Sequence, residues 1–234
     1  MAEVETPSQP DPLTSAKWVL SETLATLERV RGDMRAMDTH IDEAKRSLVA
    51  AEALRQGWVE NNPDRESQAR QWFTESCESA VRVGRQAYTR IEWARSNVEQ
   101  ALEMIDSELP TRDVPVSLQM TRFRRELDAL HMDLREASPL LRKVTDRLEQ
   151  EVALARQELD AAPDQGWSRA VGAMTTTETT NRYLGTELSR AYALAAQASS
   201  NVDSIGEAAR QRMQAHRDRH SPGSSSPPPP PVTR

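Results

Sequence analysis

Histidine and acidic side chains are the first candidates for a chemical role, because helical bundles build metal sites from inward-facing Glu and Glu-x-x-His pairs. No Glu-x-x-His occurs around any of the four histidines. His131 follows Asp128 by three residues, but both lie beside the apolar positions Leu127 and Leu130 instead of on them. The chain also lacks the phosphate-binding patterns GxxxxGK and GxGxxG. We therefore expect no catalytic residue, no bound metal and no cofactor.

Cys77 is the only cysteine, and it falls on an apolar helical stripe with Phe73 and Ala80. Burial there should keep its thiol unreactive. A single cysteine cannot form an internal disulfide, which is typical of a reducing compartment. The opening MAEVETPSQPDPLT has acids where a signal peptide needs basic and then apolar residues, and no stretch is apolar for long enough to span a membrane. We expect a soluble, cytoplasmic protein.

Residues 175–181 (TTTETTN) form an unusual polar segment within an otherwise apolar pattern. Branched threonines lower helix propensity, and Asn181 falls on an apolar position where a buried amide would need partners. Together, Asn181 and Thr177 predict either a polar layer that fixes helix register or a hinge that a ligand or partner could use. The plainer alternative is a tolerated weak stretch whose threonines mostly face solvent.

The end of the last apolar stripe carries a basic cluster made of Arg210, Arg212, Arg217 and Arg219. Cations complement the negative end of a helix dipole, so a solvated helix end is one interpretation. The other is a contact for an acidic partner, an anionic membrane surface or a nucleic acid.

The chain ends in a Ser/Pro-rich segment, residues 219–234, with a five-proline run from Pro227 to Pro231. Such a segment cannot bury apolar surface and should stay disordered with polyproline II character. It predicts either a solubilising spacer or a ligand for a polyproline-recognising domain.

Composition indicates the elements that must position these residues. Only 4% of residues are aromatic and only 8 are glycine, which favours helices over sheets. The net charge of −6 comes from 36 acids and 30 bases spread along the whole chain, so no domain-wide positive field supports general nucleic-acid binding.

Apolar residues recur with heptad spacing in four long segments, which predicts four amphipathic helices with coiled-coil packing. We expect a flexible lead at 1–11, a bundle over 12–218 and helices at about 12–57, 63–109, 116–161 and 165–218. The first stripe shows the pattern clearly, with Leu20, Leu27, Met34, Ile41 and Leu48 on one row.

Short connections between helices of similar length predict an elongated, antiparallel, up-down-up-down four-helix bundle. Gly57 should close the first helix in the left-handed conformation. Trp58 and Trp167 fall on apolar positions at turns that share one end, so we expect them to plug that end of the core. Pro139 falls on an outward position, which predicts a kink in the third helix instead of a break.

The leading functional hypothesis is a non-enzymatic structural or adaptor protein that uses a rigid helical rod to contact other proteins, with self-association left open. Trp58, Trp167, the basic cluster and the proline run are the candidate partner contacts. The alternative is a lipid- or membrane-surface-associated bundle that opens at an interface. A metal-dependent helical-bundle enzyme comes third, because the sequence offers no convergent polar set.

Overall fold

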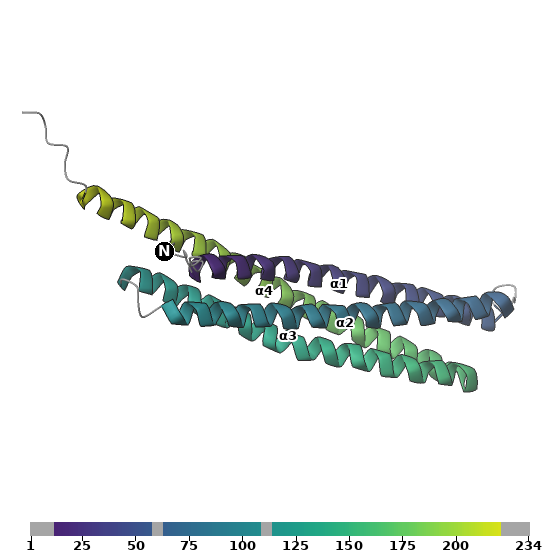
Figure 1. The fold of residues 1–234 in the computed structure, drawn as a ribbon. Coiled ribbons are helices and arrows are strands. Elements are labelled where there is room, and N and C mark those ends of the chain that lie inside the picture. Colours follow the sequence, from purple (N-terminus) through teal and green to yellow (C-terminus); the bar gives the residue numbers. More distant parts are fainter. Residues whose placement is uncertain (1–11, 58–62, 109–113, 221–234) are drawn as a thin grey trace, which may run out of the picture.

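The computed structural model describes residues 12–57, 63–108 and 114–220, and within them it consists of four long helices (Figure 1). The helices lie antiparallel and side by side, which confirms the all-α, up-down-up-down bundle. At about 1.5 Å of rise per residue, the 44 residues of the first helix span roughly 66 Å. The helices are α1 (Pro12–Arg55), α2 (Pro63–Glu108), α3 (Val114–Ala161) and α4 (Pro163–His220).

Each helix packs against its two neighbours, and among the described residues the diagonal pairs α1/α3 and α2/α4 have no Cα atoms within 8 Å of each other. The contacts are densest within the two hairpins, α1–α2 and α3–α4, and sparser where one hairpin meets the other. Because α1 and α3 carry bulky apolar rows while α2 and α4 carry many alanines, large and small side chains alternate around the bundle. The molecule is therefore two tight hairpins packed on each other.

The two turns at one end of the rod use glycine for different reasons. Gly57 has a φ of 72° and its N–H donates to the carbonyl of Leu54 (3.2 Å), so it ends α1 in the left-handed conformation. Gly166 lies inside α4, where an added Cβ would approach the backbone N of Leu159 to 2.5 Å. Here the absence of a side chain lets α3 and α4 come close together.

The start of α4 differs from the expected one. We expected this helix to begin at about residue 165, but α4 already begins at Pro163, and only Ala162 separates it from α3. Proline is well suited to the first helical position, since its fixed φ is helical and its missing N–H would have no partner there. The N–H of Gly166 then donates to the carbonyl of Ala162 (3.1 Å).

Pro139 does not interrupt α3, which runs unbroken through it. The proline is exposed, as expected for an outward position. Proline leaves the carbonyl four residues earlier without its helical donor, and an outward position lets water take that place. The helix can therefore continue on its buried side.

The core is divided into two clusters along the rod. We call the part near the N-terminus, the α2–α3 connection and the end of α4 the terminal half, and the part near the α1–α2 and α3–α4 connections the turn half. The terminal half holds the larger cluster, which includes Leu27, Ile91, Phe123, Leu134 and Leu188. The turn half holds the smaller one, which includes Ile41, Leu48, Phe73, Leu148 and Met174.

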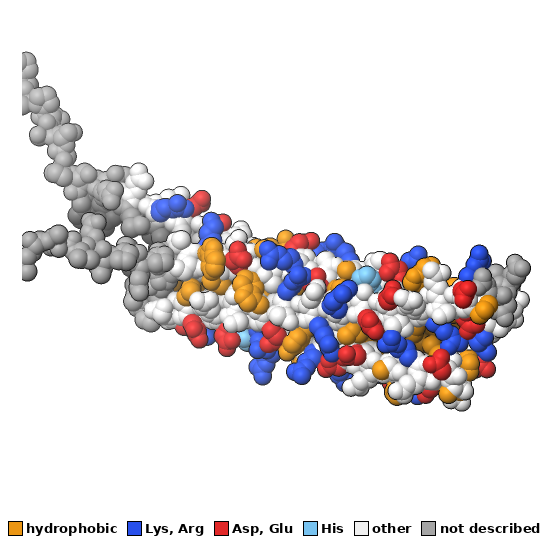
Figure 2. Space-filling view, turned by 45° about the vertical axis from the view of Figure 1, so that its right-hand side comes forward, with side chains coloured by type: hydrophobic (Ala, Val, Ile, Leu, Met, Phe, Trp, Pro, Cys, Tyr) orange, Lys and Arg blue, Asp and Glu red, His pale blue; other side chains and the backbone are white. Residues whose placement is uncertain are grey.

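The surface is a mosaic of both charge signs. On the face seen in Figure 2, basic and acidic side chains alternate and the hydrophobic ones form small separate groups. Many charges pair across helices, as Lys45 does with Glu178 (2.5 Å) and Arg124 with Asp106 (2.5 Å). Within the described part of the chain, no helix has the length and apolar character needed to cross a membrane.

Candidate functional site

Of the two tryptophans expected to plug the turn end, the structure describes one. Trp167 is partly buried and packs against the core cluster of the turn half. Its indole Nε1 is buried and has no hydrogen-bond partner. Trp58 lies outside the described residues, so its half of the plug stays a prediction.

The candidate contacts near the C-terminus are described only in part. Arg210 is exposed and its Nε donates to the carbonyl of Gly206 (3.3 Å). The side chains of Arg212, Arg217 and Arg219 lie outside what the structure describes, and so do Pro227 and Pro231. With its 58 residues, α4 is the longest helix, and it continues past the start of α1 (Figure 1).

Asn181 and Thr177 lie in the core, in a polar layer between the two halves. Asn181 is only 2% exposed, and its Nδ2 donates to a carboxylate oxygen of Asp38 on α1 (2.9 Å). Its Oδ1 is buried without a partner. Thr177 and Thr145 are buried as well, and each hydroxyl donates to a carbonyl of its own helix.

Gly84 completes this polar layer from α2. A Cβ at Gly84 would lie 2.6 Å from Oγ1 of Thr145 and 3.3 Å from Sδ of Met37. All four helices therefore contribute to the level at which the apolar core is interrupted, through Met37 and Asp38, Gly84, Thr145, and Thr177 with Asn181.

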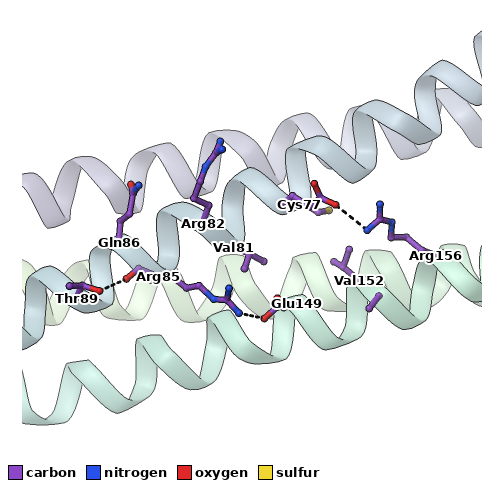
Figure 3. Close-up of a pocket in the computed structure, with 11 residues that line it drawn as sticks. Cys77, Val81, Arg82, Arg85, Gln86, Thr89, Glu149, Val152 and Arg156 are labelled. Atoms are coloured by element: carbon purple, nitrogen blue, oxygen red, sulfur yellow. Dashed lines mark hydrogen bonds and ion pairs between the residues drawn. The ribbon is translucent and has the colours of Figure 1, made fainter.

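A groove between α2 and α3 runs along the turn half, and Figure 3 shows the side chains that line it. Its volume is about 600 Å³. The floor is made by Val81 and Val152, with Cys77 beside them, all buried. Burial raises the pKa of the Cys77 thiol to about 12, so the thiol stays protonated and unreactive at neutral pH. The expected burial of Cys77 is confirmed.

Two ion pairs bracket this groove (Figure 3). Arg85 of α2 contacts Glu149 of α3 at 2.5 Å, and Arg156 of α3 contacts Glu78 of α2 at 3.2 Å. Both pairs are largely exposed, so they contribute little to stability. The groove therefore combines an apolar floor with charged rims.

A second set of hollows follows the α3–α4 seam in the turn half. The innermost, about 180 Å³, has apolar walls from Val144, Leu148 and Ala173 and a polar edge with Lys143 and Arg147. A wider hollow of about 680 Å³ continues towards the α3–α4 turn. On the α4 side the edge is formed by the threonine-rich segment, through Thr176, Thr177 and Thr180.

Three tryptophans on the α1–α2 hairpin are exposed although large apolar side chains are normally buried. Trp18 is 65% exposed, Trp72 53% and Trp93 45%. Trp72 and Trp93 are three heptads apart on α2, so they lie on one face of that helix. Neither ring belongs to the buried core clusters.

The histidines and acids do not converge. Across the described residues, no group of three His, Cys, Asp or Glu side chains is placed to hold a metal ion. His131 is partly buried with an unpartnered Nδ1, and His40 lies 3.1 Å from Glu43 on the same helix.

Apart from Cys77 and the threonine-rich segment, the residues that line both grooves were not singled out from the sequence. In the sequence, nothing distinguishes the charged lining residues from other solvated charges on helix faces; these residues are Lys143, Arg147, Arg82 and Glu149. Only the threonine-rich segment carried a local signal, because its composition departs from its surroundings. No protein-family model, curated protein or solved structure matches this chain.

Proposed function

We propose that this chain is a non-enzymatic structural or adaptor protein, in which a rigid helical rod presents binding surfaces to other proteins. The observation that carries this proposal is the exposure of Trp18, Trp72 and Trp93 on one hairpin. The bundle fills its core without them, so folding does not require tryptophan at these outward positions. Tryptophan is the side chain most enriched among residues that dominate protein interfaces.

The test is capture of a partner in native cells by a photo-crosslinking residue placed next to these tryptophans, followed by identification. The triple variant Trp18→Ser, Trp72→Ser and Trp93→Ser should lose the partner that the wild-type chain captures in stoichiometric amount. The matched control is Leu118→Ser with Met132→Ser, because both are exposed apolar residues on α3. Equal capture by the triple variant and the control would contradict the proposal.

One observation favours a second candidate, association with an anionic membrane surface. Helix α4 continues past the start of α1 (Figure 1), and the sequence places Arg210, Arg212, Arg217 and Arg219 in this extension. Flotation with vesicles containing anionic lipid separates the two candidates. Flotation that high salt abolishes would favour the membrane, and absence of flotation at low salt would remove it.

A further inference from the structure

Cross-helix polar partners line the α3–α4 seam on both sides of one gap. In the terminal half, Glu126 accepts a hydrogen bond from Nε2 of Gln197 (3.0 Å) and Asp133 lies 3.3 Å from Arg190. Near the turn end, Arg169 of α4 contacts both Glu151 (2.9 Å) and Glu158 (2.8 Å) of α3.

Between these two sets of contacts, two basic side chains of α3 have no acidic ion-pair partner among the described residues. Lys143 and Arg147 are exposed, and neither lies within 4.0 Å of a carboxylate in the part of the chain that the structure describes. The acid one turn beyond Arg147 is Glu151, which contacts Arg169 instead. Asp146 lies 3.7 Å from Arg142. The acidic partners that the seam has elsewhere are missing at this level.

The α4 residues opposite these cations are threonines with spare acceptors. The hydroxyl of Thr176 donates to the carbonyl of Gly172 and that of Thr180 to the carbonyl of Thr176, both at 2.9 Å. A hydroxyl that donates to its own helix keeps acceptor capacity for an incoming N–H donor. Beside them lies the apolar hollow of about 180 Å³ between Val144, Leu148 and Ala173.

We propose that this gap in the α3–α4 seam binds an acidic peptide segment of a partner protein. The segment's carboxylates would pair with Lys143 and Arg147, its backbone N–H groups would donate to Thr176 and Thr180, and one apolar side chain would fill the hollow. A peptide supplies all three kinds of group, whereas a small inorganic anion would use only the cations. This inference rests on the proposed function, since it names the chemistry of a partner and where it binds.

The test measures fluorescence anisotropy of the full chain with a labelled peptide of repeating Glu-Glu-Leu, and with a Gln-Gln-Leu peptide as its uncharged match. The variant Lys143→Gln with Arg147→Gln should weaken binding of the acidic peptide at least about tenfold, a loss of ~1.4 kcal/mol. The control is Arg125→Gln with Arg135→Gln. It removes the same charge from exposed positions of α3 outside the gap and should leave binding unchanged.

The threonines and the hollow give a second, independent readout. Thr176→Val with Thr180→Val keeps the cations and removes the acceptors, so it should weaken the acidic peptide and leave competition by inorganic phosphate unaltered. If the control Arg125→Gln with Arg135→Gln weakens binding as much as Lys143→Gln with Arg147→Gln does, the proposal is overturned in favour of general charge attraction. Phosphate that competes as well as the peptide would overturn it in favour of a simple anion site, and so would absence of peptide binding.

Failure here is distinguishable from failure of the proposed function. If Lys143→Gln with Arg147→Gln still captures the cellular partner as the wild type does, the adaptor function stands and this binding site is wrong. If no partner is captured by the wild type, the adaptor function fails, while the anisotropy measurement still decides whether the gap binds an acidic peptide.

Discussion

The two halves of the rod are built from the same heptad pattern but differ in the size and composition of their buried apolar clusters. In the terminal half, α4 contributes a long apolar row that ends with Val202 and Ile205. In the turn half, the fully buried α4 contribution is only Ala170 and Met174, since the next seam positions are Thr177 and Asn181. The grooves described above lie mainly in the turn half.

This difference relates core composition to surface shape. The turn half holds fewer buried apolar residues than the terminal half, and polar Thr177 and Asn181 occupy seam positions next to it. A groove with a floor of Val81 and Val152 lies beside this smaller cluster. The larger core cluster and the grooves therefore lie mainly in different halves, while the exposed Trp18 and Trp93 lie in the terminal half.

Truncation of the two buried phenylalanines should show the largest difference between the halves. Phe123→Ala in the terminal half is expected to lower the free energy of unfolding by about 3–5 kcal/mol, and Phe73→Ala in the turn half by the lower end of that range. Urea denaturation measures both values. Hydrogen exchange should show that Phe73→Ala loosens the turn half first. Equal losses with uniform exchange along the rod would mean that the two halves do not differ.

A side chain at Gly84 should disturb the polar layer between the halves. Gly84→Ala places a Cβ 2.6 Å from Oγ1 of Thr145, and overpacking of about 1–3 kcal/mol should exceed the gain in helix propensity of about 1 kcal/mol. Thermal unfolding should give a lower Tm, which Thr145→Ala partly restores. Gly172→Ala is the matched control, because no atom lies within 4 Å of its added Cβ, and it should raise Tm. A stabilised Gly84→Ala would contradict the close packing.

Replacement of the buried amide should sharpen the role of the polar layer. Asn181→Leu removes an unpartnered buried oxygen, and the exposed Asp38 can exchange the lost hydrogen bond for water, so we expect the free energy of unfolding to rise by about 1 kcal/mol. Asn201→Leu is the control in the terminal half, where the amide binds Glu126, and it should not stabilise. Urea denaturation checks both, and a destabilised Asn181→Leu would show that the layer holds the helices together.

The smallest effects should be two pH dependences of opposite sign, one in each half. Burial raises the pKa of Asp133 despite Arg190, so this group favours folding below its unfolded pKa and loses that contribution as pH rises through the folded pKa. The bond from Arg55 lowers the pKa of Glu52, so its contribution is present at neutral pH and is lost as pH falls. Asp133→Asn should therefore raise Tm at pH 7, and Glu52→Gln should lower it.

Both differences from wild type should shrink as the pH approaches about 3, where carboxyl groups in the unfolded chain are protonated. Circular dichroism melts at several pH values measure them. The same sign of effect for Asp133→Asn and Glu52→Gln at pH 7 would contradict the opposite environments of these two acids.

Much of the fold could be predicted because the relevant signals are local. The heptad rows specify which face of each helix is buried, and Asn181 and Cys77 lie in the core where their seam positions place them. Gly57 closes α1 in the left-handed conformation, as its position after the apolar row indicates. The start of α4 was misplaced because proline is compatible with both a turn and a first helical turn.

The candidate surfaces could not be predicted in the same way. Lys143 and Arg147 have the sequence surroundings of any solvated helix face, and nothing local tells that threonines of α4 lie opposite them. Their lack of acidic partners depends on the axial register between α3 and α4, which the close approach at Gly166 helps to set. The exposure of Trp72 and Trp93 likewise depends on how far α1 covers α2.

The sequence by itself determined that four helices form, which residues they bury and where a polar layer interrupts the apolar rows, since a repeat of seven residues acts within each helix. Only the tertiary structure decided which charges meet across helices, which charges lack partners and where grooves remain. Those properties depend on the spacing and register of separate helices, which are set by packing of the whole bundle and its turns.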